Sequence, residues 1–174
     1  AVRTLAARRG IDVVLGFAER DGDRLHNSAL LIGADGGIAA HYRKVHCRAF
    51  EADWGDGAFS PGDTFPVAVR PYGRVGLMIC FDREVAESVR CLRAAGAELI
   101  ACPLATDTHD LLRPGAVADN ELVTRVRAAE NEVAIAVVNH AARFNGGTFV
   151  VGPDGAPVVQ MGPGPEVRAV ELDL

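Results

Sequence analysis

The stretch that decides the fold is RVGLMICFD, residues Arg74–Asp82. Its apolar run is typical of a buried strand, and the helix-like segment Arg83–Ala95 follows at once. Cys80 stands where the strand ends and the helix begins, beside unpaired backbone N–H groups and the positive end of a helix dipole. Such an elbow activates a thiol and builds an oxyanion site, so the position predicts a nucleophile. The alternative is a small core residue, because free cysteines are often buried.

The composition is that of a globular protein. The chain has 174 residues, 49% hydrophobic and 24% charged, and this length is enough to bury a sizeable core, so we expect a single domain over residues 1–174. The formal net charge of −5 and the scattered basic residues argue against binding to nucleic acid or to a membrane surface. No apolar run reaches the roughly 18 residues of a membrane span. Small neutral or polar partners fit these properties better.

The cysteine pattern favours a reducing compartment. The four cysteines are Cys47, Cys80, Cys91 and Cys102. None of them forms a C-x-x-C pair, so neither a disulfide framework nor a zinc knuckle is predicted, and we expect the cytoplasm. His41, His46 and Cys47 lie close in sequence, but no second cluster completes four ligands, so no metal is expected.

Strand-like and helix-like segments alternate along the chain. A helix over Ala1–Arg9 ends at Gly10, and a strand over Ile11–Phe17 follows. Asp-Gly turns predict two similar hairpins. Their strands are Ser28–Ile32 with Ile38–Tyr42, and Thr148–Val151 with Pro157–Met161. Between the hairpins we expect strands Val75–Ile79, Glu98–Pro103 and Val133–Asn139, and helices Arg83–Ala95 and Val117–Asn131. This order predicts an α/β fold with mixed sheets, in two similar halves that pack sheet against sheet.

A basic segment, YRKVH at residues 42–46, ends the second strand of the first hairpin. If strands Ile38–Tyr42 and Val75–Ile79 share one sheet, their ends bring Lys44 beside Cys80. The ammonium group there favours the thiolate and stabilises the charge of a tetrahedral intermediate. The alternative is a solvated lysine at a strand end.

Four motifs in a fixed order indicate a family. They are YRKVH at 42–46, SPGD at 60–63, VGLMICFD at 75–82 and RAAEN at 127–131. Together they closely resemble the nitrilase superfamily of carbon–nitrogen hydrolases, over nearly the whole chain. The resemblance implies an α-β-β-α sandwich in which a cysteine attacks an amide or nitrile carbon, a lysine stabilises the charge and a glutamate acts as general base. By matched position, Cys80 is the nucleophile and Lys44 the lysine.

The resemblance also implies site residues and a departure. The family's base normally lies upstream of the part matched here, which implies a chain truncated at its N-terminus. Glu51 best matches a second glutamate that helps to position substrate, and its alternative is a surface carboxylate. The expected substrate contacts are Phe81, whose backbone N–H faces the oxyanion, and Thr106, at the start of a pocket-lining loop. No cofactor is implied, and a homo-oligomer is expected because family members generally associate through helices.

These features predict a thiol-dependent hydrolase of a non-peptide C–N bond. Cys80-Phe81-Asp82 looks like the amidase branches, which favours an amide or carbamoyl substrate and release of ammonia or an amine through a thioester. Two alternatives stay open: nitrile hydrolysis, and a catalytically inactive truncated homologue with a role in packing or partner binding.

Overall fold

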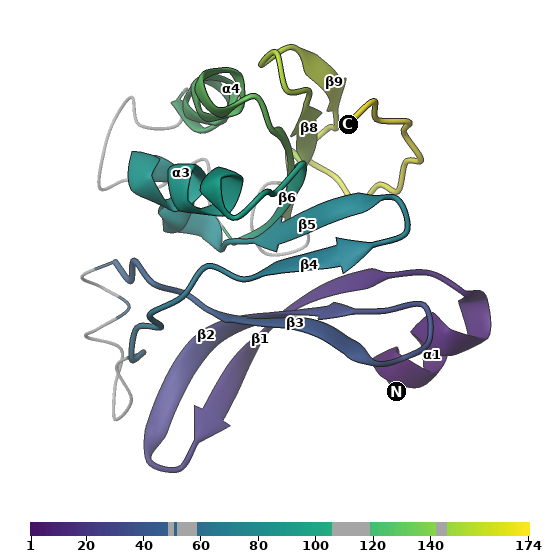
Figure 1. Ribbon diagram of the computed structural model, residues 1–174, viewed down its shortest axis with the longest axis vertical. Coiled ribbons are helices and arrows are strands. Elements are labelled where there is room, and N and C mark those ends of the chain that lie inside the picture. The colour runs from purple at the N-terminus through teal and green to yellow at the C-terminus, as the bar shows by residue number, and fades with distance from the viewer. Residues whose placement is uncertain (49–50, 52–58, 106–118, 142–145) are drawn as a thin grey trace.

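The computed structural model contains two β-sheets that stack face to face (Figure 1). Two helices cover the outer face of one of these sheets. The structure describes residues 1–48, 51, 59–105, 119–141 and 146–174. One cluster of buried apolar side chains draws on both sheets and includes Leu31, Leu77 and Ile135. The mixed α/β class predicted from the alternation of elements is therefore confirmed. Among the described residues, the layers are helices, sheet and sheet, and α1 lies at one end of the first sheet.

The first sheet is antiparallel, with strand order β1-β2-β3. Its strands and the helix before them are α1 (Val2–Arg9), β1 (Val13–Asp21), β2 (Arg24–Ile32) and β3 (Ile38–Arg43). The predicted hairpin between β2 and β3 is confirmed. Gly36 adopts φ +79° in its turn, and a Cβ there would lie 2.9 Å from the backbone oxygen of Arg3. The Asp-Gly turn is therefore needed both for the backbone conformation and for the close approach of α1.

The second sheet is mixed, with strand order β4-β5-β6-β7-β8-β9, and β5, β6 and β7 run parallel. Its strands are β4 (Val67–Arg70), β5 (Gly73–Leu77), β6 (Leu99–Leu104), β7 (Ala134–Asn139), β8 (Phe149–Val151) and β9 (Pro157–Gln160). The connecting helices are η1 (Cys80–Glu84), α3 (Ala86–Ala94) and α4 (Asp119–Asn131). α3 and α4 cover the face of this sheet that points away from the first sheet (Figure 1). The β8–β9 hairpin is confirmed as predicted.

Two sequence-based points differ from the structure. The condition that strands Ile38–Tyr42 and Val75–Ile79 share one sheet is not met, since they belong to different sheets. β4, which the sequence pattern did not predict, pairs with β5 and forms the edge of the second sheet. β3 and β5 therefore belong to the two opposite layers of the sandwich, with no ladder of hydrogen bonds between them. The helix expected from Arg83 begins only at Ala86, because the chain first makes the 3₁₀ turn η1.

A carboxylate at one end of the sandwich joins the two sheets. Asp12, just before β1, accepts hydrogen bonds from Arg70 Nε and Nη2 at 2.6 and 2.9 Å and from the Tyr72 hydroxyl at 2.6 Å. The Ala34 backbone N–H donates a fourth at 2.7 Å. Arg70 and Tyr72 belong to the β4–β5 hairpin, so these bonds cross from one sheet to the other.

Within the described residues, no helix has the length and apolar character that crossing a membrane requires.

Candidate active site

Cys80 sits at a strained elbow. β5 ends at Leu77, and Cys80 adopts φ +49° before η1 turns the chain toward α3. Among the described residues, only Cys80 and Glu132 combine a side chain with positive φ. A left-handed conformation costs a residue with a Cβ about 1–2 kcal/mol, so the surrounding structure must hold it in place. The half-buried Cys80 therefore lies at the strand-to-helix junction where the sequence pattern predicted it.

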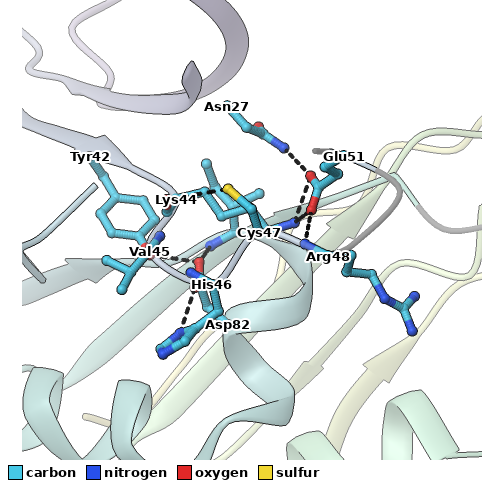
Figure 2. Close-up of polar contacts among 10 residues, drawn as sticks. Asn27, Tyr42, Lys44, Val45, His46, Cys47, Arg48, Glu51 and Asp82 are labelled. Carbon is cyan, nitrogen blue, oxygen red and sulfur yellow. Dashed lines mark hydrogen bonds and ion pairs between the residues drawn. The ribbon is translucent and has the colours of Figure 1, made fainter. Parts of the chain in front are cut away.

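Lys44 is a buried ammonium group paired with Glu51. The side chain is 1% exposed, and Nζ donates to both carboxylate oxygens of Glu51, at 2.8 and 2.6 Å (Figure 2). Asn27 of β2 donates to Oε1 at 3.0 Å, and the backbone N–H of Arg48 donates to Oε2 at 2.7 Å. The expectation of a solvated lysine at a strand end, the alternative for Lys44, was wrong. Glu51 is likewise buried and not a surface carboxylate.

The environment of Glu51 keeps its carboxylate ionised. Burial by itself raises the pKa of Glu51, but the hydrogen bonds from Lys44 and from the Arg48 backbone outweigh it, and the pKa is lowered below its ordinary value. A carboxylate with a lowered pKa that accepts hydrogen bonds from Lys44, Asn27 and the Arg48 backbone is a weak proton acceptor near neutral pH. It is well suited to hold a lysine in one position.

A second carboxylate, Asp82, links the Lys44 segment, drawn in Figure 2, to the turn that carries Cys80. It is fully buried in η1, where Oδ2 accepts from the Tyr42 hydroxyl at 2.6 Å and from the Ile79 backbone N–H at 3.0 Å. Oδ1 accepts from the His46 backbone N–H at 2.8 Å and lies 3.1 Å from His46 Nδ1. The Tyr42 hydroxyl also accepts from the Val45 N–H at 3.1 Å. Burial and the adjacent Asp82 charge raise the pKa of Tyr42 well above its usual range, so the hydroxyl remains a donor.

Two of the other three cysteines lie in settings that raise the pKa of the thiol. Burial, together with the nearby Glu51 charge, raises the pKa of Cys47, and Cys47 Sγ lies 3.9 Å from the Lys44 carbonyl oxygen. Burial raises the pKa of Cys102 in β6 to about 12. Cys91 is exposed on α3. Since the thiolate is the nucleophilic form, Cys47 and Cys102 are poor candidates for chemistry.

The remaining predicted contacts are only partly described. Phe81, next to Cys80, packs under the Arg48 guanidinium, whose central carbon lies 4.9 Å from the ring centroid. Thr106, predicted to contact substrate, lies outside the described residues. His41 and His46 do not gather around one point, because His41 Nε2 is 2.8 Å from Glu19 whereas His46 contacts Asp82.

Three members of the site were missed from the sequence: Asn27, Tyr42 and Asp82. Tyr42 and Asp82 belong to two of the four motifs, but no local sequence pattern indicates that their side chains form a hydrogen bond. Asn27 belongs to none of the four motifs and lies just before the predicted strand Ser28–Ile32, so no sequence signal pointed to it.

Comparison with known proteins matches the chain to a family. Residues 1–174 match the model of the family described as carbon-nitrogen hydrolase. An (R)-stereoselective amidase from Pseudomonas sp is 36% identical over 174 residues, which cover 96% of this chain and 59% of that protein. The chain thus spans about three fifths of the length of this curated relative.

Solved structures agree in fold. A carbon-nitrogen hydrolase from Helicobacter pylori G27 superposes with a TM-score of 0.88 at 25% identity, covering 99% of this chain and 65% of its own. A glutamate-to-glutamine variant of the amidase from Nesterenkonia sp. AN1 has a TM-score of 0.80 at 32% identity, covering 94% of this chain and 64% of its own. That structure contains the product of Michael addition of acrylamide at the active-site cysteine.

Proposed function

The chain belongs to the carbon-nitrogen hydrolase family. We propose that it acts as a thiol-dependent hydrolase of an amide or carbamoyl C–N bond, with Cys80 as nucleophile and Lys44 as its cationic partner. The observation that carries the proposal is the shared anchoring of the two residues. Asp82 accepts hydrogen bonds from the segments on either side of Lys44 and from the residue before Cys80. The cysteine adduct in the Nesterenkonia amidase supports the choice of residue.

The proposed reaction has two steps. The Cys80 sulfur attacks the carbonyl carbon, while Lys44 and the Phe81 backbone N–H stabilise the oxyanion. The C–N bond then breaks, the thiol proton is passed to the nitrogen, and ammonia or an amine leaves a thioester behind. Water next adds to the thioester carbon, releasing a carboxylic acid and restoring the thiol. Glu51 acts here by holding Lys44, because its lowered pKa makes it a weak base.

Ammonia release from a panel of small primary amides tests the proposal. We expect activity in the protein, loss of activity in Cys80→Ala, and unchanged activity in Cys91→Ala, which removes the exposed thiol of α3. Activity that survives Cys80→Ala would overturn the assignment of the nucleophile. If no amide is hydrolysed and Cys80 shows no selective reactivity, the inactive-homologue alternative takes its place.

Self-association and a cytoplasmic location remain predictions. The exposed apolar residues Leu122 and Val126 lie one turn apart on α4 and mark the helix face where contact between subunits is to be sought. Sedimentation of the protein and of Leu122→Glu tests this expectation, with a shift toward monomer expected in the variant.

A further inference from the structure

We infer that Asp82 is a positioning residue, which sets the Lys44 segment against the Cys80 elbow and so makes the reactivity of the thiol depend on the lysine. The inference rests on the proposed function, because the pair that Asp82 positions is the proposed catalytic pair. Asp82 itself is held away from substrate, since its side chain is fully buried and surrounded by its donors.

Two residues that flank Lys44 in sequence donate hydrogen bonds to the Asp82 carboxylate. Tyr42 stands two residues before Lys44 and His46 two residues after it, and both donate to Asp82, at 2.6 and 2.8 Å. Figure 2 shows the Tyr42 hydroxyl and the His46 backbone converging on this one side chain. The turn that carries Lys44 is thereby attached at both ends to a single group.

The same carboxylate attaches the elbow. The Ile79 N–H donates to Oδ2 at 3.0 Å, and the Asp82 N–H donates to the Ile79 carbonyl oxygen at 3.1 Å. Cys80 lies between these two residues, in its left-handed conformation. The two bonds close the 3₁₀ turn around Cys80 and oppose relaxation of its strained backbone.

No sheet ladder performs this task. β3, which ends at Arg43, and β5, which ends at Leu77, belong to different sheets, so main-chain pairing does not fix the distance between Lys44 and Cys80. Apolar packing between sheets tolerates small sliding motions, whereas hydrogen bonds to a buried carboxylate are directional. Asp82 therefore provides a directional connection between the two halves of the site, beside the 3.2 Å contact of Ser88 Oγ with His46 Nδ1 and the packing of Arg48 on Phe81.

The competing explanation is that Asp82 only stabilises the sandwich, and the chain offers a matched control for it. Asp12 also joins the two sheets, because it binds Arg70 and Tyr72 of the β4–β5 hairpin as well as Ala34 of the β2–β3 turn. Its partners lie at the β2–β3 and β4–β5 turns, the opposite end of both hairpins from Lys44 and Leu77. Asp12→Asn loses a sheet-joining carboxylate without touching the site.

The experiment measures the alkylation rate of Cys80 by iodoacetamide, read by peptide mass spectrometry, with and without Lys44→Ala. In the wild-type background, we expect Lys44→Ala to slow Cys80 by about tenfold or more, within the range found for directly coupled residues. In the Asp82→Asn background, the same substitution is expected to change the rate by less than about twofold, because the Lys44 segment is no longer attached to the Cys80 turn through a carboxylate. In the Asp12→Asn background, the full effect of Lys44→Ala is expected to persist.

The outcomes separate the two proposals. If Cys80 of the wild type reacts no faster than the exposed Cys91, the proposed function fails. The positioning role is overturned by a different result: Cys80 is selectively reactive, yet Lys44→Ala slows it as much in the Asp82→Asn background as in the wild type. Asp82→Asn would then lower only the stability, as is expected of Asp12→Asn. Should Asp82→Asn not fold, Tyr42→Phe removes a single hydroxyl of the same network. A reduced lysine effect in Tyr42→Phe supports the inference, and an unchanged one refutes it.

Discussion

Tyr42 donates a 2.6 Å hydrogen bond to Asp82 Oδ2, and this bond joins β3 of the first sheet to η1, the turn that follows β5 of the second sheet. Both side chains are fully buried. A hydroxyl paired with a charged acceptor, away from water, contributes more than an ordinary hydrogen bond, and its loss leaves buried groups without partners. The pair is therefore important for stability as well as for the geometry of the site.

Tyr42→Phe is expected to lower the free energy of unfolding by about 2 kcal/mol, because Asp82 and the Val45 N–H both lose a buried partner. Urea denaturation measures the loss. Tyr72→Phe is the matched control, since Tyr72 also bonds a carboxylate at 2.6 Å but is 51% exposed. We expect a loss of less than about 1 kcal/mol there. Equal losses in the two variants would contradict the argument from burial.

The four thiols are expected to differ in alkylation rate near neutral pH. Cys80 reacts fastest if it is the nucleophile, whereas Cys47 and Cys102 react slowly because burial raises the pKa of each. Cys91, exposed on α3, supplies the reference rate of an ordinary thiol. Peptide mass spectrometry of timed samples gives all four rates at once. Modification of Cys102 ahead of Cys91 would show that the buried setting is misassigned.

Glu51→Gln is expected to destabilise the protein by about 3–5 kcal/mol, because it leaves the Lys44 ammonium buried without its counter-charge. The double variant Lys44→Met with Glu51→Gln is expected to recover part of this loss, since no buried charge is left uncompensated. Urea denaturation of the four members of the cycle measures the coupling. Additive losses would show that the two groups do not depend on each other.

Glu19 on β1 is expected to contribute to stability in a pH-dependent way. The Arg43 hydrogen bonds, helped by Ser28 and His41, lower the pKa of Glu19 from 4.5 to about 2. A lowered folded-state pKa means that the contribution is present above pH 4.5 and is lost as the pH falls through about 2. Glu19→Gln is therefore expected to cost about 1 kcal/mol at neutral pH and nothing near the acid limit. Urea denaturation of the protein and of Glu19→Gln across this pH range checks whether their free energies of unfolding become equal at low pH. A difference in free energy that does not change with pH would contradict the prediction.

Gly62→Ala is expected to destabilise the protein by about 1–3 kcal/mol, because the added Cβ would lie 2.2 Å from the Arg43 carbonyl oxygen. Gly62 also donates its N–H to the Lys44 carbonyl oxygen at 2.8 Å, so displacement of this segment is expected to disturb Lys44. Gly162→Ala is the control, since no atom within 4 Å opposes a Cβ there. Thermal unfolding compares the two, and similar midpoints would argue against a tight approach at Gly62.

Much of the fold was predictable because it depends on neighbours in sequence. The hairpin turns at Gly36 and Gly155 carry positive φ, which Asp-Gly supplies locally. The strand before Cys80 was evident from its unbroken apolar run. β4 escaped prediction because no Asp-Gly turn joins it to β5, whereas β9, an edge strand of the same four residues, was predicted from such a turn. The sequence left open whether β3 and β5 share one sheet, and the structure has them in different sheets.

The sequence by itself determined the local structure: the hairpins, the buried strand of RVGLMICFD and the elbow that presents Cys80. Only the tertiary structure decided that Glu51 neutralises Lys44 and that Asp82 joins Tyr42 to the Cys80 turn. The physical reason is that periodicity and turn chemistry act over a few residues, whereas Tyr42 and Asp82 are 40 residues apart in the chain. Their contact depends on how two separate sheets stack, and no local pattern encodes that distance.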